Sequence, residues 1–239
     1  MTSYLPMARL IAATITALSV ISVPLVASAA STIARPLLNT ERGDVQLGES
    51  VLTGRYQQVF PDTSFYLTEP FEIHEIRLRP QSPGSFSVAL SDVQISLGYT
   101  DARPLSMSDR FEDNEGSAPS VVYSGALDLH SNGASMRPWR DFDLVVDLQD
   151  PFTYDPSEGS LLLEWDNRGS VSSGGVAPNF DAISTRFGSL LAASGGAEIG
   201  EISQGGLSAR FSDGTVPEPT GALLFAIGTV VTLARRRHA

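Results

Sequence analysis

Cysteine and lysine are both absent from this chain of 239 residues, and histidine occurs only three times. Without cysteine the protein can form neither disulfides nor thiolate metal sites, so its folded state depends on packing and polar contacts. All 16 basic residues are arginine, and the 27 acidic residues bring the formal net charge to -11. A surface of this charge repels nucleic-acid phosphates. We therefore expect no nucleic-acid partner.

Motifs for catalysis are also missing. The chain has no Gly-x-Ser-x-Gly sequence and no cysteine nucleophile, and zinc motifs built on His-x-Glu-x-x-His are absent. Of the histidines in the middle of the chain, we interpret His74 as a solvent-facing or hydrogen-bonded strand residue and His130 as part of an "HSNG" turn. The sequence therefore predicts a protein that is not an enzyme, with no catalytic residue and no cofactor.

The N-terminus has the features of an export signal. Arg9 precedes the apolar stretch "LIAATITALSVISVPLV", which is followed by the small residues Ala-Ser-Ala. Small residues at this place are what a signal peptidase requires, so we predict a signal peptide at residues 1–29 with cleavage after Ala29 or Ala30. A linker at 30–44 then follows. A buried N-terminal helix or a retained anchor are the alternatives.

The C-terminus combines a short apolar segment with a basic cluster. Residues 221–234 carry no charge and, as a helix, would span about 21 Å. A bilayer core is roughly 30 Å thick, so the segment suits transient insertion better than a permanent anchor. The arginines that follow it, Arg235, Arg236 and Arg237, should stay on the cytoplasmic side. That topology agrees with an exported N-terminus.

Directly before this segment stands Val216-Pro217-Glu218-Pro219. This motif, the short apolar helix and the arginine cluster, in that order, resemble the PEP-CTERM sorting signal of bacterial exported proteins, a tail also called the ice-binding protein C-terminal domain. The resemblance covers residues 215–239. It implies an exosortase-type membrane protease as partner, and release or re-anchoring after processing. The prolines favour an extended backbone that a protease can reach. A plain anchor is the alternative, and no regular Thr-x-Thr ladder supports ice binding.

Between the ends, hydrophobic residues alternate with polar ones at the period of a β-strand. "DFDLVVDLQ" directs Phe142, Leu144, Val146 and Leu148 to one face, and "SLLLEWD" directs Leu161, Leu163 and Trp165 inward, with Leu162, Glu164 and Asp166 opposite. In "FEIHEIRLR" and "FSVALSDVQISLGY" the alternation changes parity, which predicts a β-bulge in each. Further expected strands are Arg55–Phe60, Val121–Leu129, Ala182–Phe187, Ala197–Ile202 and Leu207–Phe211.

Turn-forming segments separate these strands: "QSPGS", "DNEGSAP", "HSNGAS", "YDPSEGS" and "NRGSVSSGG". They leave no room for crossover helices, and no long amphipathic helix is expected outside the two ends. The sequence therefore predicts an all-β domain at residues 45–214, an antiparallel β-sandwich of jelly-roll type.

Calcium is the metal that this sequence could bind most readily, because it takes oxygen ligands from loops. The candidate ligands lie in "DRFEDNEG"; they are Asp109, Glu112, Asp113, Asn114 and Glu115. The spacing is not that of an EF-hand, and a solvated acidic loop is the alternative. A second, weaker cluster is Asp150 with Asp155.

Polysaccharide is the other ligand class to consider. Glu164 and Asp166 share one face of a strand at about 6.6 Å, a spacing that suits glycoside cleavage but that polar strand faces often show by accident. Trp139 and Tyr154 fit no inward row and are candidate sugar contacts.

Together these features predict an exported, non-catalytic protein of the cell surface or extracellular matrix, transiently anchored in the membrane by its C-terminal helix. The alternative is a carbohydrate-binding module acting on exopolysaccharide. A polysaccharide-acting enzyme is the third hypothesis.

Overall fold

The computed structural model describes residues 33–34, 45–48, 50–65, 68–81, 84–116, 119–133, 141–184, 188–203 and 205–213. The predicted signal peptide with its cleavage residues Ala29 and Ala30, the sorting motif and the terminal arginines lie outside these residues, as does Trp139. Within the part of the chain that is described, no helix has the length and apolar character needed to cross a membrane.

Strands make up most of the described fold. In chain order they are β1 (Ile33–Ala34), β2 (Val45–Gly48), β3 (Arg55–Phe60), β4 (Phe71–Leu78), β5 (Phe86–Thr100), β6 (Ser120–Ser131), β7 (Leu144–Tyr154), β8 (Ser160–Asn167), β9 (Val171–Gly175), β10 (Asn179–Ile183), β11 (Gly188–Ala192), β12 (Glu201–Ser203), β13 (Gly206–Leu207) and β14 (Ala209–Ser212). The only α-helix among the described residues is α1 (Ser50–Thr53). The 3-10 turns are η1 (Asp62–Ser64), η2 (Glu112–Asn114) and η3 (Pro156–Glu158). The predicted all-β class is confirmed.

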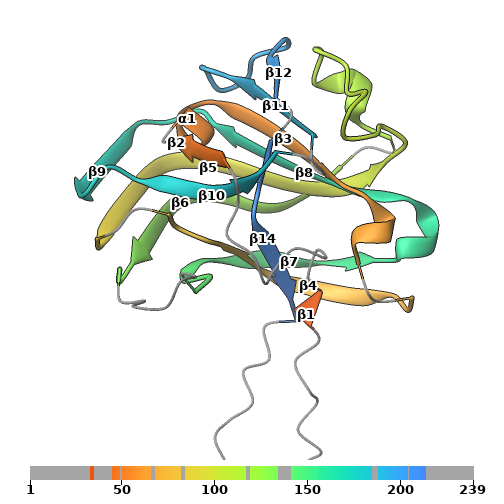
Figure 1. Cartoon of the computed structure of the whole chain (residues 1–239), viewed down its shortest axis with the longest axis horizontal. Helices are drawn as coiled ribbons and strands as arrows, with labels where there is room; N and C mark the ends of the chain where they lie inside the picture. The colour runs from red at the N-terminus through yellow and green to blue at the C-terminus, as the bar shows by residue number, and fades with distance from the viewer. Residues whose placement is uncertain are drawn as a thin grey trace, which may run out of the picture.

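The strands form three antiparallel sheets (Figure 1). The largest has seven strands in the order β12-β11-β3-β8-β5-β6, with β9 paired to β5, while the second has the order β1-β14-β4-β7. A small third sheet, β13-β10-β2, is linked to the chain after β4 by a bridge between Pro80 and Phe180. All the pairings between the described strands are antiparallel, as the turn-rich separators predicted.

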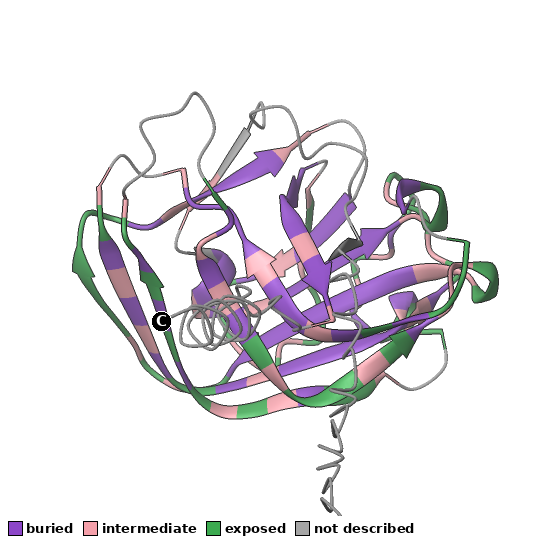
Figure 2. Ribbon diagram, turned by 90° about the horizontal axis from the view of Figure 1, so that it is seen from below, coloured by how far each residue is buried: buried purple, intermediate pink, exposed green. Residues whose placement is uncertain are grey.

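The main hydrophobic core lies where the inner faces of the seven-stranded and four-stranded sheets meet. It contains Tyr56 and Phe60 of β3, Trp165 of β8, and Ile76 and Phe211 from the four-stranded sheet. Figure 2 shows the resulting alternation of buried and exposed residues along the long strands. The inward row predicted for β8 is confirmed, and in β7 Leu144 and Val146 belong to the core with Leu148 half-buried against it. Phe142, expected in the same row, precedes β7 and is buried outside this core.

Both predicted bulges are present. The pairing of β4 with β7 shifts register between Ile73 and Glu75, and that of β5 with β6 shifts between Leu90 and Val93. Each shift restores the hydrophobic residues to the inner face after the change of parity. Strand β3 has the predicted bounds.

Other expectations were wrong in detail. Ile33 and Ala34, assigned to the linker, pair with β14. The segment "NRGSVSSGG" was expected to be a separator, but Val171–Gly175 forms β9 against β5. Of the stretch Ala197–Ile202, only its last two residues belong to a strand, β12. Glycine and serine obscured β9 because they lack the side chains that mark strands in a sequence.

Candidate functional site

The outer face of β3 and β8 is covered rather than exposed. The connection from β5 to β6, residues 101–116, and the connection from β11 to β12, residues 193–200, cross this face and join through a bridge between Arg110 and Ile199. A second, small hydrophobic core fills the space beneath them, formed by Val59, Met107, Phe111, Leu162, Leu190 and Ala192. As a result every residue from Leu161 to Asn167 is buried, including the Glu164 and Asp166 that were expected on a polar face.

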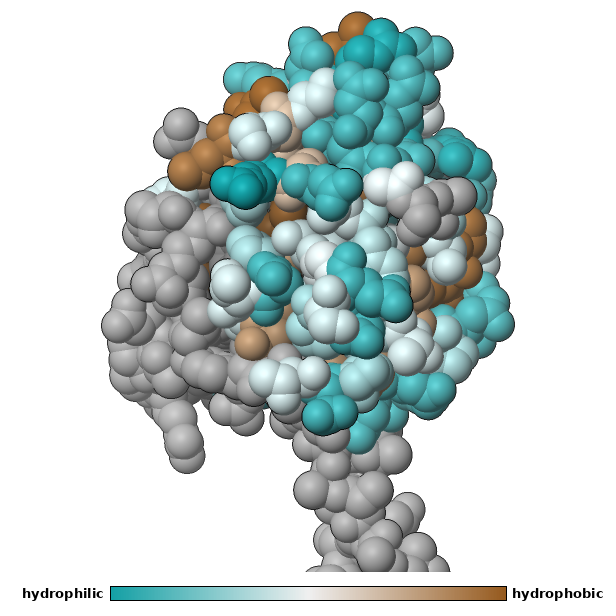
Figure 3. Space-filling model, turned by 90° about the vertical axis from the view of Figure 1, so that its right-hand side faces the viewer, coloured by the Kyte–Doolittle hydropathy of each residue, from teal (hydrophilic) through white to brown (hydrophobic). Residues whose placement is uncertain are grey.

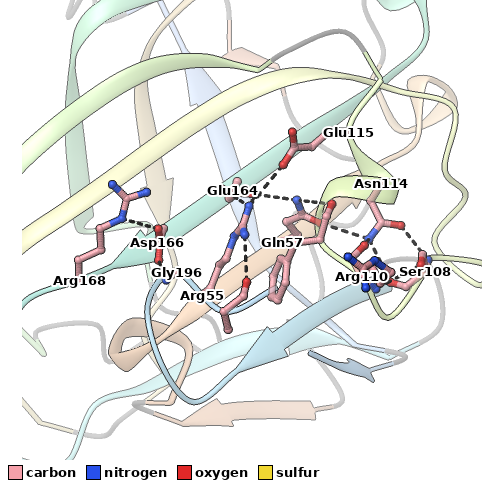
Figure 4. Close-up of polar contacts among 12 residues, drawn as sticks. Arg55, Gln57, Ser108, Arg110, Asn114, Glu115, Glu164, Asp166, Arg168 and Gly196 are labelled. Carbon is pink, nitrogen blue, oxygen red and sulfur yellow. Dashed lines mark hydrogen bonds and ion pairs between the residues drawn. The ribbon is translucent and has the colours of Figure 1, made fainter. Parts of the chain in front are cut away.

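Arg55 is at the centre of a polar cluster on this covered face (Figure 4). Its Nη2 donates to both carboxylate oxygens of Glu164, at 2.9 and 3.0 Å, and to Glu115 Oε1 at 3.3 Å. Its Nη1 donates to the carbonyl oxygen of Ala197 at 2.9 Å, and its guanidinium carbon lies 4.5 Å from the centre of the Phe111 ring. Arg55 therefore connects two neighbouring strands to both covering segments.

Two amides complete this group, which we call the Arg55 cluster: Arg55, Gln57, Asn114, Glu115 and Glu164. Gln57 Nε2 donates to Glu164 at 2.6 Å, and its Oε1 accepts from Asn114 Nδ2 at 3.2 Å. The Asn114 amide also bonds to the backbone of Ser108 and Arg110, so it fixes the fold of the 101–116 segment. Burial and the neighbouring Glu164 raise the pKa of Glu115 above its ordinary value, and Arg55 opposes them.

Asp166 occupies the far end of the same strand face. Its Oδ2 accepts from Arg168 Nε at 2.7 Å, and its Oδ1 accepts from the backbone N–H of Gly196 at 2.7 Å. Glu164 and Asp166 therefore lie on one face of β8, as their spacing predicted, but each is buried and bound to an arginine. Neither is presented to a substrate.

A second buried ion pair lies away from this face. Arg79 and Asp181 are 3% and 2% exposed, and Arg79 Nη1 lies 3.1 Å from Asp181 Oδ2, which also accepts from Ser208. The Phe142 ring has the guanidinium carbons of Arg79 and Arg210 each 4.4 Å from its centre. Sequence reasoning missed this group because its members come from four distant segments.

The proposed calcium ligands do not converge on a common point. Asn114 and Glu115 belong to the Arg55 cluster, Glu112 pairs with Arg110, and Asp113 accepts from Ser108 Oγ at 2.8 Å. No group of three or more histidine or acidic side chains within the described ranges could hold a metal ion. In the weaker cluster, Asp155 caps η3 by accepting from the Ser157 backbone N–H.

Tyr154 is not a surface residue, so its assignment as a sugar contact was wrong. Its side chain is fully buried, its ring stacks on Tyr99 with centres 5.6 Å apart, and its hydroxyl donates to the Gly159 carbonyl at 2.8 Å. Tyr154 has the same parity as Leu144 and Val146 of β7, so the alternation of that strand, continued past the irregular pairing with β4, already directs its ring to the inner face.

The two histidines of the domain agree with a structural role. His74 is half-buried on β4 with its Nε2 3.2 Å from Glu72 Oε2, as interpreted from the sequence. His130 is exposed but lies within β6, opposite Ser87, rather than in a turn.

Comparison with protein-family models, with curated proteins and with solved structures gave no match to this chain.

Proposed function

We propose that this protein is an exported, non-catalytic component of the cell surface or extracellular matrix. In this proposal its domain is an antiparallel β-sandwich of jelly-roll type, and the PEP-CTERM-like tail directs it to an exosortase-type membrane protease. Residues of both large sheets contribute to one hydrophobic core, which supports the sandwich assignment.

One observation carries the non-catalytic part of the proposal. Each buried carboxylate among the described residues is paired with an arginine; the pairs are Glu75 with Arg77, Glu164 with Arg55, Asp166 with Arg168, and Asp181 with Arg79. A general acid or nucleophile must be able to reach a substrate, whereas a carboxylate that accepts several bonds from one guanidinium stabilises a fold. Ion pairs and polar networks then perform the stabilising role that disulfides often have in exported domains.

The absence of lysine fits the same interpretation. Arginine presents five donors in a planar arrangement and stacks on aromatic rings, which lysine cannot do as well. Arg55 uses both properties at once, toward Glu164 and Phe111. The upper part of Figure 3 combines a hydrophilic surface with hydrophobic patches, and the covering segments carry both exposed acidic residues and the exposed Leu105 and Ile199.

The carbohydrate-binding alternative loses Tyr154 and now depends on Trp139 alone. Glycan-array binding by the wild-type protein that disappears in Trp139→Ala would favour it. Release of reducing ends from matrix polysaccharide that disappears in Glu164→Gln would instead favour an enzyme.

Variants of the tail test the proposed sorting. Replacing Arg235, Arg236 and Arg237 with serine should let the tail pass through the membrane, because charged side chains no longer hold it in the cytoplasm. The protein would then be secreted with an uncut tail. Replacing Pro217, Glu218 and Pro219 with alanine should leave the topology intact and keep the full-length form in the membrane. Fractionation with an antibody to the C-terminus distinguishes the two, and wild-type processing of both variants would contradict the proposal.

A further inference from the structure

The two ends of the described fold lie side by side. β1 pairs with β14 so that Ile33 is opposite Ser212, and β14 pairs with β4 so that Ser212 is opposite Glu75. β4 in turn places Glu75 opposite Asp147 of β7. Figure 1 shows β1 and the end of β14 at the lower side of the molecule, with β12 at the upper side. Both chain ends therefore leave the domain from the four-stranded sheet.

The connections from this sheet to the two apolar segments are short. Ile33 lies four residues after Ala29, and the uncharged C-terminal segment begins at Gly221, nine residues after Ser212. At about 3.3 Å per extended residue these connections reach at most about 13 Å and about 30 Å. A domain of the size of residues 45–214 is about 40 Å across. Both connections are thus shorter than the domain. The N-terminal one holds the domain only until the signal peptide is cleaved after Ala29 or Ala30, whereas the C-terminal one holds it until the tail is processed.

We infer that the four-stranded sheet is the side of the domain that faces the lipid bilayer. The covered face of the seven-stranded sheet, with the Arg55 cluster, then points away from the membrane. This inference rests on the proposed function, because it takes the C-terminal apolar segment as membrane-inserted. It adds to that function an interaction surface and an orientation.

The distribution of charge supports this orientation. The four strands of this sheet carry the acidic residues Glu72, Glu75, Asp147 and Asp150 against Arg77 and Arg210, and Glu75 is buried in its pair with Arg77. The covering segments on the opposite side are more acidic: exposed Asp101, Asp109, Glu112, Asp113 and Glu198 outnumber Arg103 and Arg110, and exposed Glu201 follows in β12. Anionic lipid headgroups repel the more acidic side more strongly, so the less acidic four-stranded sheet approaches the bilayer at lower cost.

Site-specific fluorescence quenching tests the orientation. The chain has no cysteine, so the exposed positions Asp147 and Ser194 can each be changed to cysteine and labelled without background. Asp147 is on the four-stranded sheet, and Ser194 is in the segment that covers the other side. The labelled full-length chain is reconstituted into phosphatidylcholine vesicles containing a lipid with a nitroxide headgroup. We expect several-fold stronger quenching of the Asp147→Cys label than of the Ser194→Cys label.

Equal or reversed quenching in vesicle-bound protein would overturn the inference while leaving the membrane tether in place. The full-length chain should float with vesicles more than a chain lacking residues 216–239. If the two chains float equally, both the inference and the proposed function are overturned. Flexible Gly/Ser insertions of about 30 residues before Ile33 and after Asp213 should abolish the difference between the labels. A difference that persists would show that the short connections are not its cause.

Discussion

Arg55 and Glu164 contact each other diagonally across β3 and β8, and one guanidinium nitrogen of Arg55 lies 2.9 and 3.0 Å from the two oxygens of Glu164. The other terminal nitrogen of Arg55 binds Ala197, which belongs to a segment 142 residues away in the chain. The pair thus attaches a covering segment to the centre of the seven-stranded sheet. Its removal should affect the stability of the fold.

Replacing Arg55 with alanine should lower the free energy of unfolding by about 3 kcal/mol, because it leaves the buried Glu164 carboxylate without its charged partner. Arg55→Lys should be intermediate, since an ammonium group cannot contact Glu164, Glu115 and Ala197 together. Urea unfolding measures both. The exposed pair of Arg110 and Glu112 supplies the control, and Arg110→Ala should leave the unfolding midpoint unchanged. Equal losses in Arg55→Ala and Arg110→Ala would refute a special role for Arg55.

Glu115 and Glu75 should affect the pH dependence of stability in opposite directions. Burial and Glu164 raise the pKa of Glu115. Burial also acts to raise the pKa of Glu75, but hydrogen bonds from Arg77 and Ser212 and the charge of Arg77 outweigh it and lower that pKa. The contribution of Glu115 is therefore present at low pH and lost as pH rises through its folded pKa. That of Glu75 is present above its unfolded pKa and lost as pH falls through its folded pKa.

Urea unfolding from about pH 3 to about pH 7 checks this prediction. As pH rises, Glu115→Gln should gain stability relative to the wild type, and Glu75→Gln should lose it. Parallel curves for the two variants would show that the assigned pKa directions are wrong.

Gly188 should not tolerate a side chain. A Cβ at this position would lie 1.6 Å from the carbonyl oxygen of Pro104, in the segment that covers the sheet. Gly188→Ala should therefore cost about 2 to 3 kcal/mol and displace that segment. Faster trypsin cleavage after Arg110 would report the displacement. Gly48→Ala is the matched control, because its nearest neighbour, Asn179 Oδ1, is at an ordinary 3.8 Å. Similar behaviour of the two variants would contradict the prediction.

Millimolar calcium should leave the melting temperature unchanged. A ligand that binds only the native state raises this temperature with its concentration. In the described structure the oxygens of Asn114, Glu112 and Glu115 already accept bonds from protein donors. A concentration-dependent rise that Asp113→Asn abolishes would restore the calcium site predicted from the sequence.

Local pattern was enough to predict much of the β domain. The alternation in "RYQQVF" and "DFDLVVDLQ" places side chains on known faces, because successive residues of a strand point in opposite directions. The parity changes near His74 and Ser91 predicted both bulges for the same reason. The spacing of Glu164 and Asp166 also placed both on one face of β8.

The outer faces could not be predicted in this way. Alternation indicates that Glu164 and Asp166 share a face, but it carries no information on what covers that face. Arg55 and the covering segments reach that face through contacts between residues far apart in the sequence. The contact between Arg79 and Phe142 is of the same long-range kind. The sequence by itself determined composition, strand periodicity and the signals that its two ends resemble. Tertiary structure alone decided that the acidic pair is bound to arginines and that both ends leave from one sheet, because each depends on contacts between segments distant in the chain.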